Sequence, residues 1–340
     1  MELQIATSAS QLSILAGVPG HISDPVAYIR ANNPMPLHAE EIIESGITEV
    51  ALDDLVLVGD LYARGLETPL PNWLGHMDMK WQKRSRVGNP VASLTPEVGL
   101  RREDAKFDLA LDGLPVYCWS AEFSIHPKLW AEWELAVSRG LTDTMLDVSI
   151  VQDYIRRMNE AIDLAVIEGP PIAPNGVHID GLIDTPNVSP FGSGTLWDAS
   201  GKTGAQIYDD IAAGIDVMQA QHHNGKVVLY VSKKYNRVLN RDYVTTMANT
   251  KSIRSRILED TDVQDIVMVP TLSKDTVLLI EPKKTNLDVI VGQRPTVFSW
   301  LSEGPVGLQV RRFMAVACVM LRIREDYDGQ NGIVKLVPTV

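Results

Sequence analysis

The sequence predicts an α+β protein organised around one long helix, and three features of the chain carry that prediction. Apolar residues recur at steps of three and four through residues 151–166, which marks one face of a helix. Strand-like stretches occur at residues 79–87 and again at residues 296–337. Between them, residues 196–293 alternate helical patterns with continuous apolar strands, which is typical of a mixed α/β unit.

We expect the long helix over residues 142–168, with a length of about 40 Å. Its end is predicted at Gly169-Pro170-Pro171, because glycine accepts a left-handed cap and proline cannot continue the hydrogen-bond ladder. The apolar face is formed by Val151, Tyr154, Ile155, Met158, Ile162, Ala165 and Val166. The polar face carries Gln152, Asp153, Arg156, Arg157, Asn159, Glu160 and Asp163.

The composition is that of an ordered, acidic protein. Hydrophobic residues make up 45% of the 340 residues, charged residues make up 22%, and the net charge is -12. This balance argues against extensive disorder and against binding of a phosphate backbone by the whole surface. No run of about 18 apolar residues predicts a membrane span. The start of the chain lacks the pattern of a secretion signal, so we expect the product to stay in the cytoplasm of the cell that makes it.

Two cysteines, Cys118 and Cys318, each lie in an apolar, strand-like run. We interpret them as small buried hydrophobic residues, and not as a disulfide framework or a zinc site.

The N-terminal third is expected to be an arm followed by a ribbon. Prolines interrupt residues 1–78, so this segment is predicted to become ordered on a partner surface; the alternative is an ordinary N-terminal subdomain. Residues 79–87 and 105–111, with a continuing run at 116–125, predict a long two-stranded excursion. An isolated ribbon is marginally stable in water, so we expect it to lie on another subunit; the alternative is a hairpin inside an antiparallel sheet.

Basic residues concentrate on this ribbon and are the candidate contact residues of the chain. In an acidic protein they favour charge contacts with a neighbouring copy, while a solvated loop and nucleic-acid binding are the two alternatives. They are Lys80, Lys83, Arg84, Arg86, Arg101 and Arg102.

Two short motifs could suggest chemistry. Ser200-Gly-Lys-Thr203 resembles the end of a phosphate-binding loop, but Leu196 stands where that loop needs glycine, and Thr203 with Gln206 instead indicates a capping box that opens a helix. His222-His223 indicates a solvated helix end, and Asp209-Asp210 a solvated helix face. No set of acid, base and nucleophile converges, so we expect no enzyme activity, no metal and no cofactor.

The order of these pieces, and some of their local sequence, resembles a known family. Residues 160–169 together with 177–186 resemble the end of a spine helix and the turn after it, and residues 226–231 with Ser232 and Tyr235 resemble a strand and the helix start of an axial domain. The family is that of major capsid proteins of tailed bacteriophages, with the Hong Kong 97-type fold that encapsulins share. The resemblance implies an N-terminal arm (1–78), an extended β-hairpin loop (79–126), a peripheral domain with the spine helix (127–195), a mixed α/β axial domain (196–293) and C-terminal strands that complete the peripheral domain (294–340).

The resemblance also implies a function by association. It implies hexamers and pentamers of this chain that close into an icosahedral virion shell around double-stranded DNA, after synthesis in the host cytoplasm. A separate scaffolding protein, a portal and a decoration protein are the partners it suggests. The alternatives are an encapsulin-type compartment shell protein and a soluble α/β enzyme that uses residues 200–203 or the paired histidines.

Overall fold

The computed structural model describes the greater part of the chain after residue 55. The described stretches are residues 56–71, 78–87, 106–124, 127–139, 149–171, 179–185, 187–190, 195–243, 251–273, 275–303, 309–324 and 331–337. The predictions for residues 1–55, and for Arg101 and Arg102, lie outside these residues.

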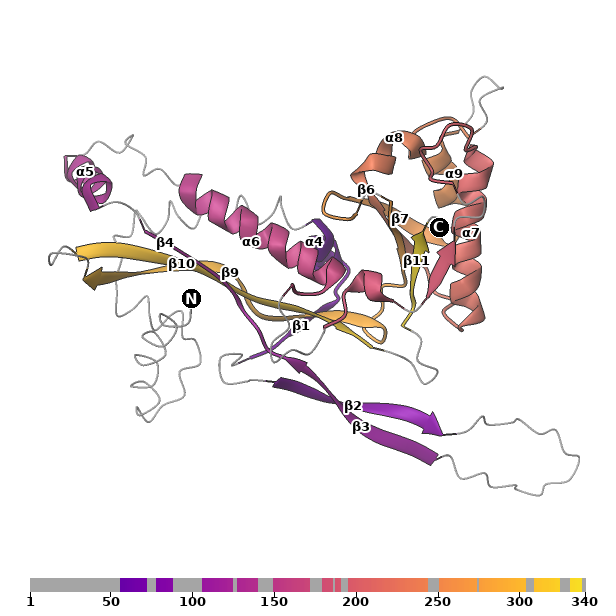
Figure 1. Cartoon of the computed structure of the whole chain (residues 1–340), viewed down its shortest axis with the longest axis horizontal. Coiled ribbons are helices and arrows are strands. Elements are labelled where there is room, and N and C mark those ends of the chain that lie inside the picture. Colours follow the sequence, from indigo (N-terminus) through magenta and orange to yellow (C-terminus); the bar gives the residue numbers. More distant parts are fainter. Residues whose placement is uncertain are drawn as a thin grey trace, which may run out of the picture.

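Strands of the described residues form three sheets, and helices lie against two of them (Figure 1). The predicted α+β class is confirmed. The strands are β1 (Glu67–Pro69), β2 (Asp78–Val87), β3 (Lys106–Pro115), β4 (Trp119–Ser124), β5 (Val188–Pro190), β6 (Val227–Ser232), β7 (Val263–Val269), β8 (Val277–Ile280), β9 (Leu287–Glu303), β10 (Gln309–Ile323) and β11 (Ile333–Val337). The helices are α4 (Val56–Ala63), α5 (Pro127–Ser138), α6 (Ser149–Glu168), α7 (Gly204–Ala220), α8 (Asn236–Leu239) and α9 (Ile253–Asp260), with 3-10 turns η3 (Leu182–Asp184) and η4 (Lys233–Tyr235).

The first sheet has the strand order β1-β9-β10-β4 and carries the long helix α6 on one face (Figure 1). Strands β9 and β10 pair antiparallel along most of their length, β4 is antiparallel to β10, and β1 is parallel to β9. Alternate residues of β10 face α6, so Phe313, Ala315 and Ala317 are fully buried in the core beneath the helix. This placement confirms the prediction that β9 and β10 pair back under the long helix.

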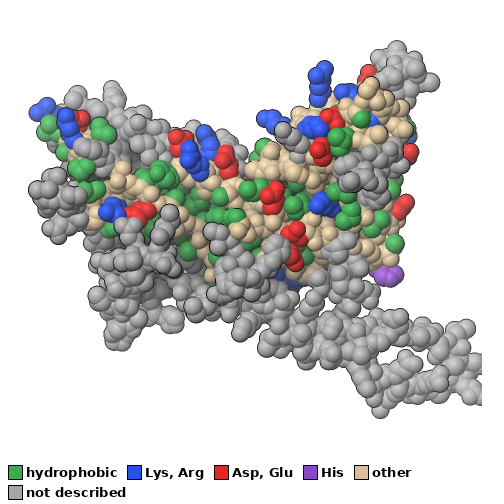
Figure 2. All heavy atoms as spheres, viewed as in Figure 1, with side chains coloured by type: hydrophobic (Ala, Val, Ile, Leu, Met, Phe, Trp, Pro, Cys, Tyr) green, Lys and Arg blue, Asp and Glu red, His purple; other side chains and the backbone are tan. Residues whose placement is uncertain are grey.

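The predicted apolar face of helix α6 is confirmed, but the predicted polar face is wrong at Asn159 and Asp163, because both side chains are fully buried. Ile155, Met158, Ile162 and Val166 are buried against the sheet, and charged side chains of both signs lie over the outer side of the helix (Figure 2). The helix ends at Glu168 as predicted, because Gly169 adopts a φ of 79°. Residues 142–148, which the prediction included, lie outside the described residues.

Gly181 brings the return loop close to the end of α6. A Cβ built on Gly181 would lie 2.3 Å from the Gly169 nitrogen and 2.4 Å from the Ile167 oxygen, so only glycine fits at this close approach.

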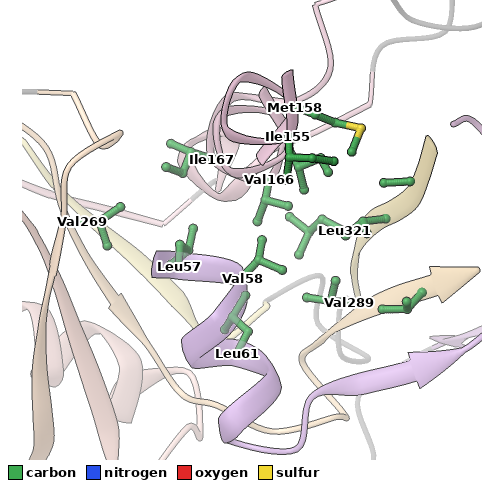
Figure 3. Packing of buried hydrophobic residues seen from close by; sticks show 14 of the residues in the cluster. Leu57, Val58, Leu61, Ile155, Met158, Val166, Ile167, Val269, Val289 and Leu321 are labelled. Carbon is green, nitrogen blue, oxygen red and sulfur yellow. The ribbon is translucent and has the colours of Figure 1, made fainter. Parts of the chain in front are cut away.

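Helix α4 fills the junction between the two larger sheets. Leu57, Val58 and Leu61 are at most 1% exposed and point toward residues of α6, β9 and β10 (Figure 3). On the opposite side, Asp60 accepts a hydrogen bond from Tyr230 Oη at 2.6 Å, and Arg64 bridges Asp60 and Asp265 at 2.7 and 2.9 Å. The expectation that residues 1–78 need a partner surface is therefore wrong for residues 56–66, which contribute Leu57, Val58, Leu61 and Leu66 to the core of the subunit.

The second sheet has the strand order β5-β11-β8-β6-β7, with α7 packed on its β5–β11 side. Strands β6 and β8 are wholly buried. Helix α7 approaches closely because Gly214 faces Leu279 and Leu336, where an added Cβ would lie 2.5 Å from Leu279. Strand β11 lies inside this sheet, so the expectation that residues 296–337 all return beneath the long helix is wrong for β11.

The third sheet is the ribbon of β2 and β3, which projects away from the other two sheets (Figure 1). Its antiparallel register runs from Asp78 opposite Pro115 to Val87 opposite Lys106. The predicted two-stranded excursion is confirmed, and the alternative of a hairpin inside a larger sheet is not what the structure has. The predicted continuation at 116–125 is instead β4, which joins the first sheet.

Candidate assembly surface

Four of the six basic candidate residues lie on one strand of the projecting ribbon. In the β2–β3 register Lys80 is opposite Gly113, Lys83 opposite Ala110, Arg84 opposite Leu109 and Arg86 opposite Phe107. The structure therefore brings these four together on β2. The other two candidates, Arg101 and Arg102, lie outside the described residues.

The ribbon joins the body of the subunit through residues 116–118. These lead directly from β3 into β4, which pairs with β10 from Ser124 opposite Arg312 to Trp119 opposite Ala317. The ribbon is thus attached to the edge strand of the first sheet. A two-stranded sheet has no neighbouring strand on either side, which leaves its outer backbone groups open to pairing with another chain.

Helix α5 is a second candidate surface, which the sequence analysis missed. Trp130 and Trp133 are buried, and the Trp130 ring lies 6.1 Å from the Phe313 ring. Leu129 and Leu135 of the same helix are 57% and 50% exposed. No local sequence signal marks these leucines as exposed, because the covered side of the helix is set by contact with Phe313, which is distant along the chain.

Lys202 of the phosphate-loop-like motif has a structural role. Its Nζ lies 2.8 Å from Asp210 Oδ2, and both side chains are at most 2% exposed. Trp197 donates a hydrogen bond to the same oxygen at 2.9 Å. The prediction of a solvated Asp210 is therefore wrong, because Asp210 is the buried partner of Lys202.

The predicted capping box at the start of α7 is confirmed. Thr203 Oγ1 accepts from the Gln206 amide at 3.3 Å, and Gln206 Oε1 accepts from the Thr203 amide at 3.0 Å. The Ser200–Thr203 motif thus starts a helix.

His223 also differs from its prediction. Its Nδ1 lies 2.9 Å from Glu281 Oε2, with the two side chains 10% and 2% exposed, so it is not a solvated helix terminus. Lys283 and Asn286 approach the same carboxylate at 2.6 and 2.8 Å. Burial acts to raise the pKa of Glu281, but the hydrogen bonds from Lys283, His223 and Asn286 outweigh it, and the pKa is lowered. His222, by contrast, is exposed and has a φ of 66°.

Asp163 of α6 caps helix α4. Its carboxylate accepts from the Leu57 and Val58 amides at 3.4 and 3.2 Å. The side chain is fully buried, which corrects its assignment to the solvated face of α6. Burial raises the pKa of Asp163 to about 6, although these amide hydrogen bonds act in the opposite direction.

Within the described residues, no group of three or more His, Cys, Asp or Glu side chains could hold a metal ion. The helices of that same part of the chain include none that is long and apolar enough to cross a membrane.

Solved structures with a similar arrangement of sheets and helices include a virus-like particle and two capsids. The virus-like particle from Pyrococcus furiosus matches with a TM-score of 0.57 at 16% identity, over 87% of this chain and 98% of that chain. The capsid of Myoviridae phage XM1 matches with a TM-score of 0.54 at 14% identity, over 78% and 86%. The capsid of a native GTA particle matches with a TM-score of 0.54 at 10% identity, over 82% and 90%. The chain therefore has a capsid fold, as the resemblance in its sequence implied.

A family model matches residues 100–335, and its description is "Family of unknown function (DUF6260)". The chain belongs to this family. No curated protein matches the sequence.

Proposed function

We propose that the chain is the major capsid protein of a tailed bacteriophage, with the Hong Kong 97-type version of the capsid fold. In this proposal, copies associate as hexamers and pentamers of an icosahedral head that encloses double-stranded DNA. The division into arm, extended loop, peripheral domain and axial domain belongs to the same proposal. Within it, helix α4 is assigned to the core beneath α6, and strand β11 is assigned to the second sheet. A scaffolding protein and a portal are its proposed partners, and catalysis is no part of its role.

The observation that carries the proposal is the projecting β2–β3 ribbon on a subunit with a capsid fold. The ribbon forms no sheet with the rest of the described chain, and two-stranded ribbons alone are only marginally stable. In the proposed shell, a neighbouring copy covers the ribbon and supplies the contacts that stabilise it. Because the chain carries a net charge of -12, basic residues on β2 favour an acidic neighbour of the same sequence.

The exposed leucines of α5 support a second contact of the same kind. Leu129 and Leu135 lie on a helix that is already anchored to β10 by Trp130. Apolar side chains exposed on a rigid support are suited to contact with another subunit.

An encapsulin-type compartment shell is the alternative, because the fold alone does not separate it from a virus head. The cargo distinguishes the two: a phage head holds DNA, and a compartment shell holds protein. An enzyme is the less favoured class, because Lys202 and His223 are both engaged in contacts within the subunit.

Electron microscopy combined with light scattering tests the proposal. The full chain is expected to form hollow polyhedra, tubes or six-membered rings, with the scaffolding protein co-expressed where the chain alone does not assemble. Particles from infected cells should contain nuclease-protected DNA. Protected cargo protein without DNA would favour the compartment, and a persistent monomer under both conditions would contradict shell formation.

The candidate contact residues are tested by reversing three of their charges, one on β2 and two in the sequence between β2 and β3. Changing Arg84, Arg101 and Arg102 to glutamate should leave the circular dichroism spectrum unchanged and abolish shell formation, because like charges would then meet at the contact. The control reverses three exposed charges near α8, namely Lys233, Arg237 and Arg241, and so alters the net charge equally. Normal shells from the ribbon variant, or equal loss in the control, would refute the role of the ribbon.

A further inference from the structure

The two cysteines of the chain are the next residues on each strand beyond the last pair of the β4–β10 register, at the root of the ribbon. The β4–β10 register pairs Ser120 with Val316 and Trp119 with Ala317. The same register, continued by one residue, places Cys118 opposite Cys318. Directly opposite residues of antiparallel strands have Cα atoms about 4.5 to 5.5 Å apart. A disulfide spans Cα separations of about 4.4 to 6.8 Å, so the register satisfies this requirement.

Both side chains belong to the same face of the sheet. Alternate residues of β10 face away from α6, and Cys318 is fully buried among them with Val316 and Met320. On β4, Phe123 faces α6, so Cys118, an odd number of residues away, lies on the face that Cys318 shares. Cys118 itself is exposed, which gives a reagent access to one of the two thiols.

The electrostatics agree with this proximity. Burial raises the pKa of Cys318 to about 12, and the Cys118 thiol adds to that rise. Cys118 is an exposed residue, but partial burial of its thiol also raises the pKa of Cys118. Both thiols are therefore less acidic than an ordinary cysteine, and only a small fraction of each is thiolate at neutral pH.

From this juxtaposition we propose that Cys118 and Cys318 form a redox-sensitive pair, which closes into a cross-strand disulfide when the protein leaves a reducing compartment. The oxidant is a small-molecule disulfide such as oxidised glutathione. The Cys118 thiolate attacks one sulfur of the oxidant, which releases one reduced thiol and leaves a mixed disulfide on Cys118. The Cys318 thiolate then attacks the Cys118 sulfur and releases the second reduced thiol. Two cysteine protons are lost, the two cysteines are oxidised, and one oxidant molecule is reduced to two thiols.

The consequence concerns the direction of the ribbon. Cys118 is the last residue before β4, so a bond to β10 fixes the point at which the ribbon leaves the first sheet. If the ribbon contacts neighbouring subunits, which rests on the proposed function, the disulfide would hold it in one orientation after assembly. The chemistry of the pair does not depend on that role.

Oxidation of the full-length folded protein tests the pair. The wild type is incubated with oxidised glutathione at about pH 8.5, near the ordinary pKa of a free cysteine, and remaining thiols are then blocked with N-ethylmaleimide under denaturing conditions. Intact mass and non-reducing peptide maps report the products. Cys118→Ser is the matched control, because it removes only the exposed thiol. Cys318→Ala separates the two steps, because it leaves Cys118 without a resolving partner.

The expected wild-type product is a single chain in which a Cys118 peptide is joined to a Cys318 peptide, with no glutathione attached and no thiol left to block. Cys318→Ala should stop at the mixed disulfide on Cys118, and Cys118→Ser should keep its remaining thiol. Any of three results would overturn the proposal: a wild type that stops at the mixed disulfide, linkage only between chains, or linkage only after unfolding. The experiment detects the disulfide bond directly. A protein that fails to assemble into shells would therefore not be mistaken for one that lacks the disulfide.

Discussion

The buried carboxyl of Asp163 should make the stability of the subunit depend on pH. The perturbation is Asp163→Asn, which removes the titrating group while keeping its shape and one acceptor oxygen for the first amides of α4. The wild-type group is fully buried, and its pKa rises from an ordinary 3.8 to about 6. The folded state therefore binds a proton more tightly than the unfolded chain does.

The sign and size of the effect follow from these two pKa values. Between about pH 4 and pH 6 the folded state holds more protons than the unfolded state, so stability falls as the pH rises through this window. The separation of the two pKa values corresponds to a free energy of about 3 kcal/mol. The unfolding free energy of the wild type, minus that of the variant, should therefore decrease by about 3 kcal/mol between about pH 4 and pH 7 and stay constant above. Taking this difference cancels the titration of all other groups.

Urea unfolding of the unassembled subunit, followed by tryptophan fluorescence across this pH range, measures the difference. Asp153→Asn is the matched control, since it makes the same substitution at an exposed position of the same helix. A difference that is flat, or that grows with pH, would show that amide hydrogen bonds outweigh burial at Asp163 and would refute the reasoning.

Three further predictions concern buried contacts within the subunit. Lys202→Met should lower the unfolding free energy by about 3 to 5 kcal/mol in denaturant titrations, because it leaves Asp210 buried without its cation; an unchanged midpoint would contradict the ion pair. Ile155→Asp should abolish soluble folded protein, because it buries an unpaired charge on the face of α6 that contacts the sheet; a normal circular dichroism spectrum would show that the face is wrongly assigned. Gly181→Ala should lower the melting temperature, because its Cβ would meet backbone atoms, whereas Gly59→Ala in α4, where a Cβ meets nothing within 4 Å, should raise stability by up to about 1 kcal/mol; equal effects of the two would refute the steric argument.

Local features of the fold could be predicted from the sequence because their causes lie within a few residues. The capping box of Thr203 and Gln206 fixes the start of α7, and Gly169 fixes the end of α6. The ribbon strands were predictable for the same reason, since a strand pattern on each side of a turn-rich segment indicates a hairpin.

Other features could not be predicted because their causes lie far away along the chain. Asp163 has the spacing of a solvated residue on α6, and its burial depends on helix α4, 105 residues earlier. The placement of β11 beside β8 depends on strand pairing across tens of residues, which no local pattern encodes. At the candidate surface the strand β2 was predictable, whereas the leucines of α5 emerge only when the burial of Trp130 shows which side of the helix is covered. The contacts of the basic residues stay a prediction.

The interleaving of strands has a consequence for how the chain is made. The first sheet needs β1 and β4 from the early part of the chain to meet β9 and β10 from its last third, and the second sheet places β11 between β5 and β8. Neither sheet can close until the ribosome has released nearly all of the residues described. Such non-local pairing makes folding slow and leaves unpaired edges exposed during synthesis. We therefore expect the nascent chain to fold after translation rather than piece by piece, with its yield limited by aggregation of the incomplete sheets.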